Sequence, residues 1–330
     1  MKLVTLLTIS FATVAGASQA VTLDSFSSYV AFGDSLTDDG KLGVLAPPSF
    51  GGRFSNGITY AEHLADDFKA SGKTTVNLAV GGATVENDNE NLVPGLEFIG
   101  TFAGQVSALE TQINFAGLGQ ALGDNPLVSV LFGGNDILQD MTEGSFIGEV
   151  GQNAADALKA GVEKVAALGP QFDDFLLVNL PDFAGAPAFS GGFLESLAAA
   201  ESMAFNERLA QNAQELRDSG LNIIEFDLFG LFEEVRAGSL GIANTTDQCI
   251  ESFRSFDPFN NCAVGLSGVD LALADNFLFI DGIHPNRIAH EAIADGIRAS
   301  LVAVPLPGSL PLLLAGVLGL GLMSGRRKAD

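Results

Sequence analysis

Five short, almost continuously apolar runs predict the strands of a buried sheet. They span residues 28–32, 75–78, 127–132, 175–180 and 222–226. Such runs are typical of parallel strands that are covered on both faces. Helix-length segments lie between or after them, at residues 60–70, 149–168, 194–218 and 288–302. This alternation predicts an α/β fold, with three α/β/α layers around a mainly parallel five-stranded sheet.

Both ends of the chain have the composition of processing segments. Lys2 precedes an apolar stretch and small residues that end at Ala20, which predicts a signal peptide over residues 1–20; the alternative is a buried N-terminal helix. Residues 304–308 read VPLPG and precede a short apolar stretch and three basic residues. This end resembles the VPLPA/PEP-CTERM sorting signals of Gram-negative bacteria. The resemblance implies a sorting tail over residues 304–330 that an exosortase-type enzyme cuts, and a plain membrane anchor is the alternative.

Charge and composition restrict what the remaining section, residues 21–303, can do. The chain has 40 acidic and 16 basic residues and a formal net charge of −24. Nucleic acid would be repelled by this charge, so we expect no nucleic-acid partner. Apolar residues make up 47% of the chain, which excludes general disorder. We expect one exported domain, secreted or held at the cell envelope.

The two cysteines, Cys249 and Cys262, lie 13 positions apart in a loop-like stretch. In an exported protein this spacing favours a disulfide over two free thiols. Neither cysteine has a partner at metal-ligand spacing, so a zinc site is not expected. The acidic run at residues 86–91 lacks the spacing of an EF-hand loop, and a solvated loop is favoured there over a calcium site.

A serine stands where chemistry is expected in such a fold. Residues 33–36 read GDSL and directly follow the first predicted strand. Ligands bind at the carboxyl ends of parallel strands, and we expect Ser35 to lie there, at a turn from strand into helix. Its backbone N–H would then lie near a helix N-terminus and could receive a developing oxyanion. The alternative is that Asp34 or Ser35 only caps that helix.

A serine nucleophile needs a base, and the chain has three histidines. His284 has Asp281 three residues before it, which can accept from the imidazole and fix its tautomer. Pro285 would then open the last helix in its first turn. His290 lies within that helix and is expected to be structural. His63 lies on the first helix and is expected to be exposed.

Two further groups could stabilise an oxyanion. Gly82 offers a backbone N–H after the second strand, and Asn135 offers a side-chain amide after the third. Taken singly, each is better explained as a turn or loop residue, but their joint occurrence with Ser35 at three strand ends in this order favours an oxyanion site. Residues 93–102, with Phe98 and Phe102, could cover an acyl groove or could equally pack in the core.

Together these features resemble the GDSL family of SGNH hydrolases, the group of secreted lipases, esterases and acyltransferases. The matching blocks are residues 31–40, 77–83, 133–136 and 281–285, and residues 52–57 and 227–229 also look like segments of this group. The resemblance implies a flavodoxin-like SGNH fold.

Carried onto this chain, the resemblance implies Ser35 as nucleophile, His284 as base and Asp281 as its orienting carboxylate. The Ser35 N–H, the Gly82 N–H and the Asn135 side chain would form the oxyanion hole. Either Gly81 or Gly82 could be the second donor, and alignment with the family's motif favours Gly82. No cofactor or metal is needed. The implied activity is secreted ester hydrolysis through an acyl-enzyme. The alternatives are a polysaccharide O-acyl esterase and, in another class, a non-catalytic surface or biofilm protein on a hydrolase fold.

Overall fold

A computed structural model describes most of the chain between the two predicted processing segments. The described residues are 22–45, 48–86, 95–144, 148–191, 193–253, 262 and 271–302. The predicted signal peptide, the predicted sorting tail and most of the acidic run lie outside them. Within these ranges, no helix combines the length and the apolar character that crossing a membrane requires.

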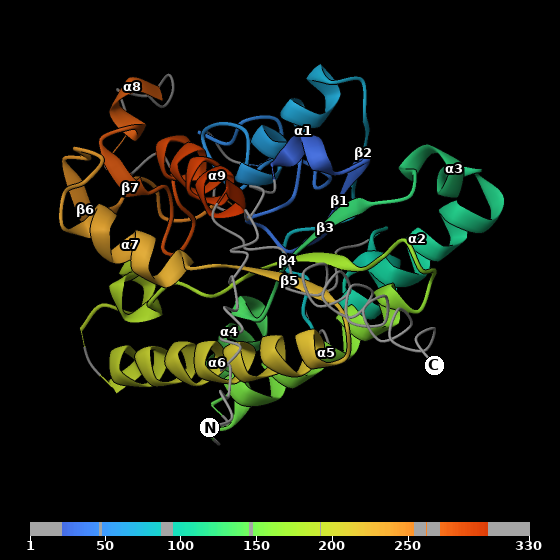
Figure 1. Ribbon diagram of the computed structural model, residues 1–330. Coiled ribbons are helices and arrows are strands. Elements are labelled where there is room, and N and C mark those ends of the chain that lie inside the picture. The colour runs from blue at the N-terminus through green and yellow to red at the C-terminus, as the bar shows by residue number, and fades with distance from the viewer. Residues whose placement is uncertain are drawn as a thin grey trace, which may run out of the picture.

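Five strands form one sheet in which every neighbouring pair is parallel (Figure 1). They are β1 (Ser28–Gly33), β2 (Thr74–Asn77), β3 (Pro126–Leu131), β4 (Asp174–Val178) and β5 (Asn222–Phe226). Their order is β2-β1-β3-β4-β5, which is the flavodoxin-like order. Every residue of β1 and β3 is buried, as their apolar runs predict. The predicted fold class and all five predicted strands are therefore confirmed.

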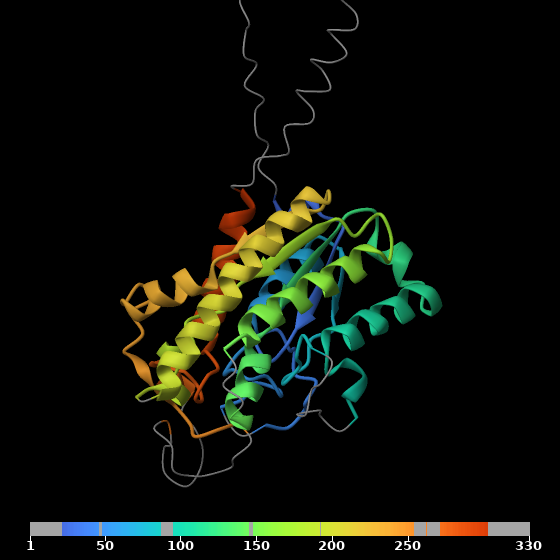
Figure 2. The ribbon, with the colours of Figure 1, turned by 90° about the horizontal axis from the view of Figure 1, so that it is seen from below.

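Helices cover both faces of this sheet. They are α1 (Tyr60–Ala70), α2 (Phe102–Phe115), α3 (Leu118–Leu122), α4 (Gly134–Glu143), α5 (Val150–Ala166), α6 (Phe193–Asp218), α7 (Leu228–Arg236), α8 (Leu271–Ala274) and α9 (Arg287–Val302). Helices α1 and α9 pack together on one face, and α2, α5 and α6 lie on the other (Figure 1). Figure 2 shows α5 and α6 side by side along the sheet.

The four predicted helices are present because their ends and faces carry the expected signals. Thr59 and Glu62 form a capping box at the start of α1, and Leu64 and Phe68 are buried on its inner face. Helix α6 ends before Gly220, whose φ of 105° is the left-handed geometry of a glycine C-cap. Helices α2, α4 and α7 were not predicted from the sequence.

A second, smaller unit stands beside the main sheet. Strands β6 (Asn244–Gln248) and β7 (Phe277–Phe279) form a two-stranded parallel sheet. A separate apolar cluster packs around it, made of Phe54, Cys249, Ile250, Phe253, Cys262, Ala274 and Ile280. Cys249 and Cys262 are joined in a disulfide, as predicted, with their Cα atoms 5.2 Å apart. We refer to the seven residues of this apolar cluster, which include both cysteines, as the disulfide cluster.

Candidate active site

Ser35 lies in a tight turn at the carboxyl end of β1. The Asp34 carbonyl accepts from the amides of Thr37 (3.1 Å) and Asp38 (2.9 Å), so the chain turns directly after the strand. No helix starts here, since the next helix is α1 at Tyr60. The prediction that Ser35 lies at the N-terminus of a helix is therefore wrong. The turn is closed by local hydrogen bonds to Asp34 instead.

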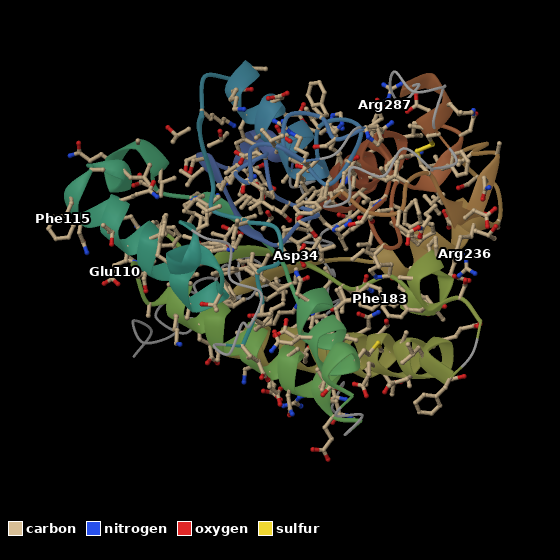
Figure 3. All side chains as sticks on the ribbon, turned by 180° about the vertical axis from the view of Figure 1, so that it is seen from behind. Asp34, Glu110, Phe115, Phe183, Arg236 and Arg287 are labelled. Carbon is tan, nitrogen blue, oxygen red and sulfur yellow. A yellow bond between two sulfur atoms is a disulfide. The ribbon has the colours of Figure 1, made fainter. Side chains whose placement is uncertain are left out.

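The turn sits at the point where the strand order reverses. Strand β1 pairs with β2 on one side and β3 on the other, and this is where ligands bind in open α/β sheets. Asp34 lies near the centre of the molecule (Figure 3). Its carboxylate and the Phe183 ring both lie within 4 Å of the position that a Cβ on Gly134 would take. The side chain of Gln105 fixes the strand end, because it accepts from the Gly33 amide (3.1 Å) and donates to the Gly33 carbonyl (2.8 Å).

The structure brings Ser35, His284 and Asp281 together in a hydrogen-bonded chain. The Oγ of Ser35 lies 2.8 Å from Nε2 of His284. The Nδ1 of His284 lies 2.8 and 2.9 Å from the two carboxylate oxygens of Asp281. All three residues are buried, each with 7% or less of its surface exposed. Residues 249 positions apart in the sequence thus belong to one continuous chain of hydrogen bonds.

Asp281 is held as a carboxylate. Burial alone would raise its pKa, but the adjacent His284 and the amides of Ile283 and His284 outweigh burial and hold the pKa below its usual range. The Oδ1 atom accepts from those two amides at 3.1 and 2.9 Å. The last helix, α9, begins at Arg287, one residue before the predicted start at residue 288, and Asn286 caps it by accepting from the Ala289 amide (2.9 Å). Pro285 therefore precedes the helix and, contrary to the prediction, does not lie in its first turn.

The second and third strand ends approach each other through Asn135. Its Nδ2 donates to the Ala83 carbonyl (2.9 Å), which places the amide beside the Gly82 loop, and the amide has a second N–H. Gly82 has a φ of 86°, a conformation that favours glycine. The amide of Gly81 donates to Oδ2 of the buried Asp38 (2.8 Å).

Two buried carboxyls flank this region. Asp136 accepts from the backbone amides of Val85 and Glu86 at 3.0–3.1 Å and so fixes the loop after Gly82. Burial raises the pKa of Asp136 to about 6, against the pull of those amides. Burial also raises the pKa of Asp34 to about 7, although the Leu36 amide and His284 act in the opposite direction. Near neutral pH, Asp34 therefore carries only part of a negative charge.

The other two histidines lie outside the Ser35 chain of hydrogen bonds. His290 is fully buried, and its Nδ1 accepts from the Tyr60 amide at 3.3 Å. This agrees with a structural role. His63 is half-buried on α1 rather than exposed as predicted. Among the described residues, no group of three histidine, cysteine, aspartate or glutamate side chains is placed to hold a metal ion.

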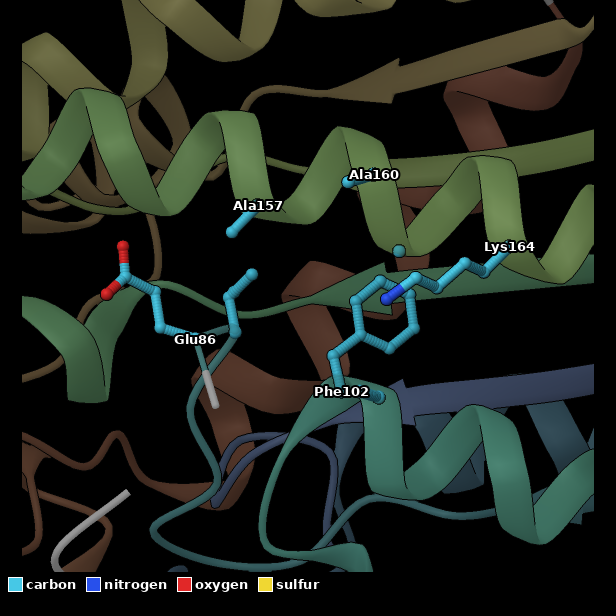
Figure 4. A pocket seen from close by; sticks show the side chains of 8 residues that line it. Glu86, Phe102, Ala157, Ala160 and Lys164 are labelled. Carbon is cyan, nitrogen blue, oxygen red and sulfur yellow. The ribbon is translucent and has the colours of Figure 1, made fainter. Parts of the chain in front are cut away.

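A cavity of about 510 Å³ opens between α2 and α5 (Figure 4). It is lined by Val85, Glu86, Phe102, Ala103, Ala157, Ala160, Gly161 and Lys164, and by none of the residues of the hydrogen-bonded chain. Phe102 is buried and stacks on Phe132 with ring centroids 4.8 Å apart, whereas Phe98 is 64% exposed. Phe102 thus packs in the core while also forming part of the cavity wall.

Sequence reasoning assigned no role to several side chains that contact the predicted site. The ring of Phe54 stacks on His284, with centroids 4.7 Å apart, and Phe253 meets the same imidazole at 5.9 Å. Asp38 and Asp136 hold the loop around Gly82. The available signal was that Asp38, Phe54 and Asp136 fall within the sequence blocks already quoted, whereas Phe253 falls in none of them.

The chain is similar to a known protein family over most of its length. The profile of the family described as "GDSL-like Lipase/Acylhydrolase" matches residues 29–297. The thermolabile hemolysin of Vibrio parahaemolyticus is 30% identical over 289 residues, which cover 84% of this chain and 64% of the relative. The phosphatidylcholine-sterol acyltransferase of Aeromonas hydrophila is 26% identical over 312 residues, 82% of this chain and 89% of the relative. This chain thus matches less than two thirds of the hemolysin.

Solved structures of similar fold include an acetylxylan esterase from Geobacillus stearothermophilus. It is 15% identical, with a TM-score of 0.44 over 83% of this chain and 94% of the esterase. A likeness at this level says nothing about the substrate.

Proposed function

This chain belongs to the GDSL-like lipase/acylhydrolase family of carboxylic ester hydrolases, and on that premise we propose that it is a serine esterase acting through Ser35, His284 and Asp281. The observation that carries the proposal is the 2.8 Å contact between Ser35 Oγ and His284 Nε2, continued by the 2.8 Å contact between His284 Nδ1 and Asp281. This is the arrangement that an activated serine nucleophile requires.

The reaction is a double displacement. His284 Nε2 takes the Ser35 proton as Oγ attacks the ester carbonyl carbon, and Asp281 stabilises the imidazolium that forms. The tetrahedral intermediate collapses, the bond to the alcohol oxygen breaks, and His284 gives the proton to the departing alcohol. Water then attacks the acyl-enzyme, with His284 again taking and returning a proton, and the acid leaves.

The developing oxyanion would be received by the Ser35 N–H, the Gly82 N–H and the Asn135 amide. The Gly81 N–H donates to Oδ2 of Asp38 (2.8 Å), so it points toward that carboxylate and not toward an incoming oxyanion. The Asn135 amide is anchored by one hydrogen bond to Ala83 and so presents its second N–H in a fixed direction. Donors that are held before the reaction need no reorganisation in the transition state.

Acyl lipids are the proposed substrate class. The names of the two relatives refer to haemolysis and to acyl transfer from phosphatidylcholine, both of which concern membrane lipids. An acylated polysaccharide is the alternative. Fatty acid released from phosphatidylcholine vesicles, with no acetate released from an acetylated polymer, would support the lipid assignment, and the opposite result would replace it.

The test of the chemistry uses short-chain nitrophenyl esters. Ser35→Ala and His284→Ala should each abolish nitrophenol release and labelling of the protein by a fluorophosphonate. Ser107→Ala, on the exposed face of α2, and His63→Ala are matched controls. Both variants should still release nitrophenol and take the fluorophosphonate label. Wild-type turnover by Ser35→Ala would refute the assignment. A wild-type protein that neither turns over nor takes the label would instead support a non-catalytic surface protein.

We also propose that the protein is exported, on the composition of residues 1–20 and 304–330. An exosortase-type enzyme would process the C-terminal segment. Mass spectrometry of the protein from its native host tests both steps. Export predicts a mature N-terminus at Val21 and a chain shortened near residue 304, and a full-length intracellular chain would contradict it.

A further inference from the structure

The segment Gly52–Gly57 matches the family but has no part in the proposed chemistry. Its side chains nevertheless contact the loop that carries His284. Ser55 Oγ donates to the Pro285 carbonyl (3.0 Å), and Asn56 Oδ1 accepts from the Arg287 amide (2.8 Å). Two successive residues of this segment therefore anchor the chain directly after His284.

Phe54, directly before these two anchors, lies against the imidazole itself. The two ring centroids are 4.7 Å apart and the planes differ by 30°. The edge of Phe253 approaches the imidazole from another direction, with centroids 5.9 Å apart and planes at 63°. Both phenylalanines are buried members of the disulfide cluster. Apolar rings thus cover the imidazole while its two nitrogens face Ser35 and Asp281.

The Phe54 ring also abuts the loop of the proposed oxyanion donors. A Cβ added to Gly81 would fall well inside van der Waals distance of the ring, and the three nearest atoms all belong to Phe54. Gly81 is fixed by its hydrogen bond to Asp38 and directly precedes Gly82. One aromatic ring therefore fills the space between the base and the donor loop.

This arrangement matters because hydrogen bonds at the two ring nitrogens leave one rotation of the imidazole unconstrained. An imidazole held only at Nδ1 and Nε2 can still tilt about the line that joins them. Contacts on its faces remove that tilt. Catalysis is sensitive to such errors of alignment, because the proton must move along a short, straight hydrogen bond.

We propose that Phe54 is a positioning residue that fixes the plane of the His284 imidazole and its spacing from the Gly81–Gly82 loop. The proposal rests on the proposed esterase function. It gives a role to the Gly52–Gly57 block and a reason for glycine at position 81, where the clash with Phe54 is the obstacle to a side chain.

The first test compares Phe54→Leu with a matched control. Leucine stays apolar but lacks the outer ring atoms, so kcat should fall by about threefold to tenfold, the size expected for loss of one aromatic contact, while KM stays nearly constant. Phe68→Leu removes an equally buried ring that stacks on Tyr29 at 5.4 Å, in the main core. It should lower the melting temperature and leave kcat unchanged.

A double-mutant cycle separates positioning from general destabilisation. Gly81→Ala should lower kcat because its methyl group displaces the Phe54 ring. In Gly81→Ala/Phe54→Leu the two ring atoms nearest the new methyl group, Cε2 and Cζ, are gone, so the combined loss of kcat should be smaller than the product of the single losses. Multiplicative losses, or an unchanged kcat in Phe54→Leu, would overturn the proposal. If Ser35→Ala keeps wild-type activity, the esterase function fails instead, so the two failures are distinguishable.

Discussion

His290 makes the folded state sensitive to acid. The residue is fully buried and its Nδ1 accepts from the Tyr60 amide, whereas its Nε2 has no hydrogen-bond partner within the described part of the chain. Burial, with a smaller contribution from His284, lowers the pKa of His290 from 6.5 to about 3. The folded protein therefore keeps this ring neutral through the whole mildly acidic range, whereas the unfolded chain takes up a proton.

The sign and size of the change in the free energy of unfolding with pH follow from proton linkage. Because the unfolded state binds the extra proton, the free energy of unfolding falls as the pH drops below 6.5 and stops falling near pH 3. At 1.36 kcal/mol for each unit of pKa difference, the full loss is about 5 kcal/mol, and about 3 kcal/mol of it is reached near pH 4.5. This is a large share of the roughly 5–15 kcal/mol that stabilises a typical protein.

The test is His290→Gln, which removes the titrating ring and keeps a polar side chain. The chain has no tryptophan and two tyrosines, so urea unfolding is best followed by far-UV circular dichroism. Between about pH 7.5 and 4.5, wild type should lose about 3 kcal/mol more than the variant. Carboxyl groups that titrate in this range change the free energy of unfolding of both proteins equally, so their contribution cancels in the difference between wild type and variant. Equal losses in the two proteins would refute the assignment of a buried, neutral His290.

Three further outcomes are expected. Asn135→Ala should lower kcat by about 10²–10³ with little change in melting temperature, and steady-state kinetics with normal turnover would argue against its role as oxyanion donor. Cys249→Ser, which opens the bridge to Cys262, should cost about 3 kcal/mol of stability, measured by urea unfolding against the oxidised wild type; a loss below about 1 kcal/mol would contradict this. Gly33→Ala should destabilise the fold by about 1–3 kcal/mol, because its Cβ would lie 2.9 Å from the Leu131 carbonyl oxygen; an unchanged unfolding midpoint would show that the strand end can shift.

The main sheet was predictable because its strands are buried on both faces. Burial demands apolar side chains at every position, and the runs in β1 and β3 stand out in the sequence for that reason. Strands β6 and β7 carry no such signal. β6 reads NTTDQ and is at most half-buried, and β7 has three residues. The small sheet and its apolar cluster could not be expected from local pattern alone.

The residues of the site were predictable where each follows a strand or a recognisable turn. Ser35, Asn135 and the Asp281–His284 pair stand at such positions, and the structure brings Ser35, His284 and Asp281 into contact. The position of Ser35 relative to a helix was not predictable, because GDSL is compatible with a helix cap as well as with a free-standing turn. Only tertiary packing decides between these conformations.

Contacts that depend on two distant segments were beyond sequence reasoning. Phe54 and His284 both lie in loops, and no local sequence pattern indicates that their ring centroids are 4.7 Å apart. The same holds for Asp136, which looks like a helix-start residue but holds the amides of Val85 and Glu86. Such roles follow only from the relative placement of whole elements.

The two apolar clusters divide the proposed machinery between them. Ser35 and Asn135 are placed by the main sheet, whereas His284 follows β7 and packs against the disulfide cluster. The base can reach the nucleophile only when the smaller unit is seated on the larger one. The hydrogen bonds from Ser55 and Asn56 and the ring of Phe54 act at this junction. Leu278 and Phe279 of β7 are buried in the main core, whereas Phe54 and Phe253 of the disulfide cluster contact the imidazole itself. Loss of the disulfide cluster would therefore remove the ring contacts of the base while the five-stranded sheet keeps its own core.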